Sequence, residues 1–194
     1  THKKALLSLW EIARHIYNQC LSESLRRVDL MRQSKRFQHL RKQPPSIERT
    51  TQFAELDQQF GFQEYALHSF VKQLRFSYLG DHLDSATSQA LATRAFKAVQ
   101  KLLFAKAKKV RFKTRATMGS LESKTNDSGI RFREGFICFG KLQLKAIINP
   151  SDPVIVYSLA HRVKYVRLIQ RKIKGKIRFY TQLVLEGKPY IKPK

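Results

Sequence analysis

Acidic residues are scarce in this chain. Its 194 residues include 14 Asp and Glu against 38 Lys and Arg, which gives a formal net charge of +24 at pH 7. Metal-dependent cleavage of nucleic acid needs several carboxylates that converge on one site. The acids after residue 100 instead stand in turn contexts or on a strand face, where turn formation explains them: Glu122, Asp127, Glu134, Asp152 and Glu186. We therefore expect no catalysis by this chain.

Cysteine motifs and long apolar runs are also missing. Cys20 and Cys138 lie far apart among apolar neighbours, and no C-x-x-C occurs, so we expect two reduced core thiols rather than a disulfide or a zinc site. No apolar run reaches about 18 residues, and no signal-peptide pattern is present. These absences predict no membrane partner and a cytoplasmic, nucleoid-associated protein of a prokaryote.

Motifs for nucleophilic or phosphate chemistry are absent as well. The histidines are scattered and form no His-hydrophobe-His pair, and no G-x-x-x-x-G-K-[ST] loop is found. One enzymatic alternative stays open, in which folding brings carboxylates such as Asp81, Asp84 and Glu122 together around a metal. Otherwise we expect no cofactor in this chain.

The apolar pattern predicts an α+β fold. Hydrophobic residues make up 42% of the chain, which is enough for a core and too many for a disordered basic tail. Apolar residues at three- and four-residue steps predict helices over 3–28, over 52–79 with a break near Gly61 and a stop at Gly80, and over 86–109 with Asp84 or Ser85 as the cap. The basic, polar stretch 31–46, which ends in Pro44-Pro45, predicts a loop or a frayed extension of the first helix.

After Lys113 the apolar residues begin to alternate with polar ones. This pattern predicts short strands over 130–133, 136–139 and 142–147, split at Gly135 and Gly140, and a turn between Pro150 and Pro153. A longer hairpin is predicted over 163–169 and 177–185, around Lys174-Gly175. The chain therefore divides into a helical half, residues 1–113, and a strand half, residues 114–194.

Positive charge is concentrated in two runs without any acid. Residues 101–194 carry 23 basic and five acidic residues, whereas residues 51–100 carry four and five. The crossover cluster, between Asp84 and Glu122, comprises Lys106, Lys108, Lys109, Arg111, Lys113 and Arg115. The hairpin cluster, between Asp152 and Glu186, comprises Arg162, Lys164, Arg167, Arg171, Lys172, Lys174, Lys176 and Arg178.

Both clusters are candidates for binding a nucleic-acid backbone. A solvated basic face, with lysines compensating a helix C-terminus, explains two or three of these cations but not all of them. Arg26 and Arg27, near the end of the first predicted helix, are further candidates. Tyr165, Phe179 and Tyr180 interleave with the hairpin cations, where they either stack on bases or fill the core.

The order of these segments resembles the N-terminal part of TnpB (insertion-sequence OrfB) transposon proteins and the related type V CRISPR effectors. The first helix, with Trp10 and Ile16-Tyr17-Asn18, resembles the family's opening helix, where an aromatic-Asn pair is common. Gln89 in the third helix and Val110-Arg111-Phe112-Lys113 resemble its Gln-containing helix and Pro-Arg-Phe-Lys crossover, with Val110 in place of proline. The hairpin 163–186 resembles the end of its wedge domain.

This resemblance implies a helical recognition domain over 1–113 and, over 114–194, a wedge domain built as a twisted antiparallel β-barrel. It implies guide RNA, target DNA and the other domains of a longer parent chain as partners. Family members open with an Arg- and Tyr-rich strand and continue into a nuclease domain, and neither is present here. Mg²⁺ would belong to that absent nuclease domain. Gln19, Ser22, Arg26 and Gln33 are candidates for contacts to the short flanking DNA motif.

Charge alone is equally compatible with other polyanion-binding proteins. An unguided basic DNA- or RNA-binding architectural module needs the same cations without a guide, and so does a protein that packs ribosomal RNA. Binding that is equal for duplex DNA and structured RNA would identify the unguided module.

Overall fold

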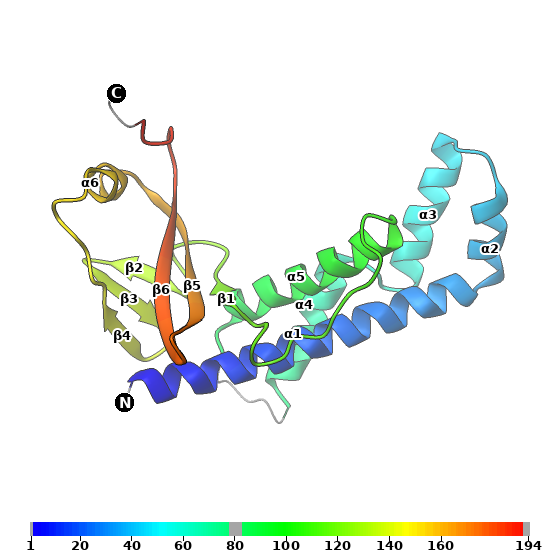
Figure 1. Cartoon of the computed structure of the whole chain (residues 1–194). Helices are drawn as coiled ribbons and strands as arrows, with labels where there is room; N and C mark the ends of the chain where they lie inside the picture. Colours follow the sequence, from blue (N-terminus) through cyan, green and yellow to red (C-terminus); the bar gives the residue numbers. More distant parts are fainter. Residues whose placement is uncertain (1, 78–82, 192–194) are drawn as a thin grey trace. The chain divides into compact units, whose positions relative to one another are not determined.

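The computed structural model describes residues 2–77 and 83–191 and has an α+β architecture (Figure 1). The chain forms two compact units. The strand-rich unit comprises Thr1–Glu11, Leu83–Ala90 and Arg115–Lys194, and the helical unit comprises Ile12–His82 and Leu91–Thr114. No helix among the described residues combines the length and the apolar character needed to cross a membrane.

Long helices supply the core of the helical unit. α1 (His2–Gln33) and α5 (Ser85–Leu103) each begin in the strand-rich unit and continue here, where α3 (Ile47–Gln59) and α4 (Glu64–Arg75) join them. Their apolar stripes are buried, as the helical periodicity predicts. The buried positions include Ile16, Tyr17, Cys20, Leu21, Val28, Leu67, Val71, Leu91, Ala95 and Val99.

The stretch 31–46 contains a helix, so the predicted loop is wrong there. α2 (Lys35–Lys42) begins after Ser34, whose hydroxyl accepts a hydrogen bond from the Phe37 N–H at 3.2 Å. Phe37 and Leu40 then pack with Met31 and Leu56 in a small buried cluster. Phe37 and Leu40, three residues apart, give α2 its buried face. The basic, polar composition of the stretch does not indicate this helix.

The other helix boundaries follow the sequence more closely. Gly61 adopts φ +64° between α3 and α4, so the predicted break is confirmed. The stop at Gly80 lies outside the described residues. Asp84 caps α5, because its Oδ1 accepts from the Thr87 N–H at 2.8 Å. α5 ends at Leu103 and not at 109, which leaves the lysines at 106, 108 and 109 outside the helix.

Two separate antiparallel sheets form the strand-rich unit, so the predicted barrel is wrong for the described residues. One sheet has the order β1-β5-β6, with β1 (Ser120–Glu122), β5 (Val163–Ile173) and β6 (Lys176–Leu185). The other has the order β2-β3-β4, with β2 (Arg131–Arg133), β3 (Phe136–Phe139) and β4 (Leu142–Lys145). An apolar cavity of about 880 Å³ lies where the sheets do not join, lined by Ile137, Leu144, Ile155 and Leu183 among others.

The predicted strands and turns at Gly135, Gly140 and Lys174-Gly175 are confirmed. Two elements were not foreseen. β1 has only three residues and exists through its pairing with Arg167–Ile169 of β5. α6 (Pro153–Leu159) begins where a turn was predicted, because Asp152 caps it and Pro153 suits its first position.

Trp10 anchors the start of α1 in the strand-rich unit. Its indole N–H donates to the Met118 carbonyl at 2.6 Å, and its ring lies 5.3 Å from that of Phe179. Both partners are more than a hundred residues away in sequence. Phe179 therefore packs inside the strand-rich unit. Of its two predicted roles, base stacking and core packing, this contact favours core packing.

Both cysteines are free, but the predicted core position holds only for Cys20, because Cys138 is half-buried. Cys20 is fully buried, and burial raises the pKa of its thiol to about 12. A thiol that stays protonated at physiological pH is a poor nucleophile, so Cys20 acts as a small core residue.

The surroundings of Gly129 leave no room for a side chain at this position. Gly129 adopts φ +74°, and an added Cβ would lie 2.8 Å from Asp84 Oδ1 and 3.0 Å from Thr87 Oγ1. Gly129→Ala should lower the free energy of unfolding by roughly 2–4 kcal/mol, through left-handed strain plus the clash with the α5 cap. Gly135→Ala is the control, because Gly135 has φ +79° and open space around it. Urea denaturation of both variants checks this, and equal losses would contradict it.

Candidate nucleic-acid interface

In most of the described ion pairs, the partner of the carboxylate is an arginine. The described ion pairs join Arg27 and Arg26 to Glu23, and Arg167 to Glu122, at 2.7–2.8 Å. Longer or more exposed pairs are Arg115–Glu11, Arg133–Asp127 and Arg162–Glu186, together with Arg36–Glu55. Within residues 2–77 and 83–191, no lysine has a carboxylate partner.

Arg26 and Arg27, both candidates from the sequence, have different surroundings. The side chain of Arg26 is 61% exposed and makes two hydrogen bonds to Glu23. Arg27 is only 15% exposed, and its Nη1 donates to the Gly61 carbonyl at 2.6 Å. Hydrogen bonds from Arg26 and then Arg27 lower the pKa of Glu23 to about 2, against partial burial. Arg27 is therefore part of the fold, whereas Arg26 remains available to solvent.

The crossover cluster lies on an irregular segment after α5. Lys106, Lys108, Lys109 and Arg111 are exposed and have no carboxylate partner in the described chain. Asn18 of α1 fixes the end of this segment: its Nδ2 donates to the Lys113 carbonyl at 2.9 Å, and its Oδ1 accepts from the Lys113 N–H at 2.7 Å. The end of this irregular segment is thus held against α1 by side chain–backbone hydrogen bonds.

Two exposed phenylalanines flank these cations. Phe104 is 60% exposed and Phe112 is 52% exposed. Aromatic faces beside unpaired cations suit the stacking of unpaired bases. The sequence does not mark these rings as stacking residues, because the exposure of an apolar side chain is decided by tertiary packing.

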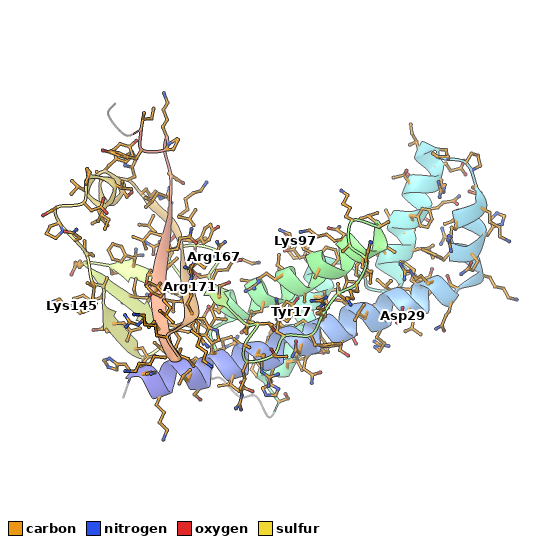
Figure 2. All side chains as sticks on the ribbon, in the orientation of Figure 1. Tyr17, Asp29, Lys97, Lys145, Arg167 and Arg171 are labelled. Atoms are coloured by element: carbon orange, nitrogen blue, oxygen red, sulfur yellow. The ribbon has the colours of Figure 1, made fainter. Side chains whose placement is uncertain are left out.

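The tip of the β5–β6 hairpin is a two-stranded basic ribbon. β1 pairs only with Arg167–Ile169, so the hairpin continues beyond it without a third strand. Arg171, Lys172, Lys174, Lys176 and Arg178 are all exposed there, and none has a carboxylate partner among the described residues. Figure 2 shows Arg167 and Arg171 projecting from β5.

Like charges face each other across this ribbon. Arg171 lies opposite Arg178 in the register, an arrangement that destabilises a hairpin unless an anion lies between the two. On the same face, Tyr180 lies opposite Ile169 and is 42% exposed. Tyr180 is therefore available for stacking, unlike Phe179.

The remaining candidates of the hairpin and crossover clusters are partly engaged. Arg167 is held by Glu122, and that hydrogen bond raises the pKa of its guanidinium. Arg115 and Arg162 have carboxylate partners but are 83% and 76% exposed, so solvent screening makes those pairs weak. Lys164 is exposed at the start of β5 and unpaired within the described chain.

No cluster of three or more His, Cys, Asp or Glu side chains with metal-binding geometry occurs among the described residues. Asp81, a member of the hypothetical metal site, lies outside them. Comparison with known proteins finds no matching family model, no significant match among curated proteins and none among solved structures. The site therefore has to be interpreted from its own geometry.

Replacing Arg27 should affect stability, whereas replacing Arg26 should not. Arg27→Ala leaves the Gly61 carbonyl and Glu23 without their partly buried donor, and we expect a loss of roughly 1–3 kcal/mol in the free energy of unfolding. Arg26→Ala removes the same charge from a solvated position and should leave the free energy of unfolding nearly unchanged. Urea denaturation measures both. An Arg27→Ala variant as stable as Arg26→Ala would show that Arg27 does not support the Gly61 turn.

Proposed function

We propose that this protein binds nucleic acid through its sugar-phosphate backbone, using the crossover cluster and the hairpin ribbon. The observation that carries the proposal is the set of exposed cations with no carboxylate partner on two structured segments. Repulsion among so many unpaired cations is relieved when a polyanion neutralises them. A two-stranded ribbon also has dimensions that a DNA major groove accepts.

We further propose that the protein acts as the recognition and wedge part of an RNA-guided DNA-targeting protein similar to TnpB and the type V effectors. The Asn18–Lys113 clamp supports this, because it joins two of the segments on which the resemblance rests, Ile16-Tyr17-Asn18 and Val110-Arg111-Phe112-Lys113. In this role the cations hold guide RNA and the guide–target heteroduplex, while base pairing reads the sequence. Catalysis belongs to a nuclease domain outside this chain.

A competition assay at about 150 mM salt tests the guided role. The competitors are a structured non-coding RNA from the same genomic neighbourhood and random duplex DNA. We expect a preference for the RNA of about a hundredfold, equivalent to roughly 2.7 kcal/mol. Equal binding of the two would favour an unguided architectural module.

Affinity should depend steeply on salt. If roughly six to ten phosphates are neutralised, the association constant should fall by about three to five orders of magnitude between 50 and 200 mM salt. Fluorescence anisotropy with a labelled RNA measures the slope. A flat response would contradict backbone binding altogether.

Charge reversal at the ribbon tip should weaken binding to every sequence alike. Arg171→Glu, Lys172→Glu and Lys174→Glu together should reduce the salt slope by roughly three units, because phosphate contacts carry no base information. Lys3→Glu, Lys72→Glu and Lys97→Glu form the matched control, since these exposed lysines lie outside both clusters. If binding were lost for only some sequences, the ribbon would contact bases and not only phosphates. If the control variant had an equal effect, the ribbon tip would have no specific role in binding.

A further inference from the structure

A polar cavity of about 600 Å³ lies in the strand-rich unit, away from the hairpin tip. One wall is the turn 124–127 with Arg133, and the other is the start of β5 with Glu186 after β6. A volume of this size is typical of sites for small ligands. Arg162 and Lys164 of the hairpin cluster line the cavity, whereas the residues of the ribbon tip do not.

A β-bulge shapes one wall. The β5–β6 register shifts between Val163 and Tyr165, so Lys164 is the extra residue. In a regular strand, consecutive side chains point to opposite faces, yet Val163, Lys164 and Tyr165 all line the cavity. The bulge therefore brings a cation and an aromatic ring to the same wall.

The opposite wall is fixed by hydrogen bonds. Asn126 is buried, its Oδ1 accepts from the Phe132 N–H at 2.7 Å, and its Nδ2 donates to the Phe132 carbonyl at 3.3 Å. Arg133 Nη2 donates to the Asn126 carbonyl at 2.9 Å and lies 3.3 Å from Asp127 Oδ1. This wall is held in place before any ligand arrives.

The charges in the cavity favour an anion. Lys124, Arg133, Arg162 and Lys164 line it together with the carboxylates of Asp127 and Glu186. Asp127 pairs with Arg133, and Glu186 pairs with Arg162 at 3.8 Å. Lys124 donates only to the Gln89 amide oxygen at 3.2 Å, and Lys164 has no partner among the described residues. Two cations are thus left for a ligand.

We propose that this cavity holds one unpaired nucleotide of the bound nucleic acid, a deepening that rests on the proposed function. Its phosphate lies against Lys124 and Lys164, in charge-assisted hydrogen bonds. Its base lies against the ring of Tyr165, since stacking on an aromatic ring needs no particular sequence. Asp127 and Glu186 also line the cavity, and their carboxylate oxygens are acceptors for the amino group of an unpaired base.

Titration of the 194-residue chain with AMP, adenosine and inorganic phosphate, at constant ionic strength, tests the proposal by calorimetry or NMR. AMP should bind at least about tenfold more tightly than either fragment, because phosphate and base each have a place. Inorganic phosphate binding as tightly as AMP would reduce the cavity to an anion site and overturn the proposal, and absence of AMP binding would overturn it as well.

Variants locate the binding. Lys164→Glu should weaken AMP at least about tenfold, and Tyr165→Leu should weaken AMP but leave inorganic phosphate within about twofold. Lys141→Glu is the control, since Lys141 carries the same charge on the exposed turn between β3 and β4. Circular dichroism verifies that each variant folds. An equal effect of Lys141→Glu would overturn the assignment.

The two proposals can fail separately. If the protein prefers the RNA in the competition assay but does not bind AMP, only the nucleotide cavity is ruled out. If neither binding is observed, the proposed function is ruled out too.

Discussion

The scarcity of carboxylates is the constraint on which the surface of this protein depends. Each acid in a described ion pair has an arginine or histidine partner, and the closest of these pairs secure particular points of the fold. Glu23 holds Arg27 beneath the Gly61 turn, and Glu122 joins β1 to Arg167 of β5. Arginine suits these roles because its planar fork makes several directed hydrogen bonds at once. The lysines among the described residues are left without carboxylate partners, and most of them are exposed to solvent.

α1 carries the residues that hold distant segments. Within the strand-rich unit, Trp10 donates a hydrogen bond to the Met118 carbonyl and packs against the ring of Phe179. Within the helical unit, Asn18 makes hydrogen bonds with both the N–H and the carbonyl of Lys113. Each contact satisfies polar groups that would otherwise be desolvated without a partner, which makes its loss more costly than its formation is favourable. The end of the crossover segment is in this way given a defined position, although that segment contains little regular structure of its own.

The sequence predicts those parts of the fold that depend on local pattern. The stripe of α1, the break at Gly61 and the Lys174-Gly175 hairpin each follow from spacing or from a glycine requirement within a few residues. β1 could not be predicted, because three residues become a strand only through pairing with β5, some 45 positions away. Ion pairing is equally non-local, so the sequence treats Arg27 and Lys108 alike although only one is engaged. The exposure of Phe104 and Phe112 and the bulge at Lys164 likewise appear only after folding.

The Arg171–Arg178 pair has a consequence for how the protein exists in a cell. Two guanidinium groups held opposite each other make the free hairpin less stable than its sequence otherwise allows, and an anion between them removes that penalty. The proposed binding of a polyanion would therefore be thermodynamically linked to folding of the ribbon, and the midpoint of thermal unfolding would depend on ligand concentration. In the complex that we propose, the repulsion between Arg171 and Arg178 is relieved, so the bound hairpin would be more stable than the free one.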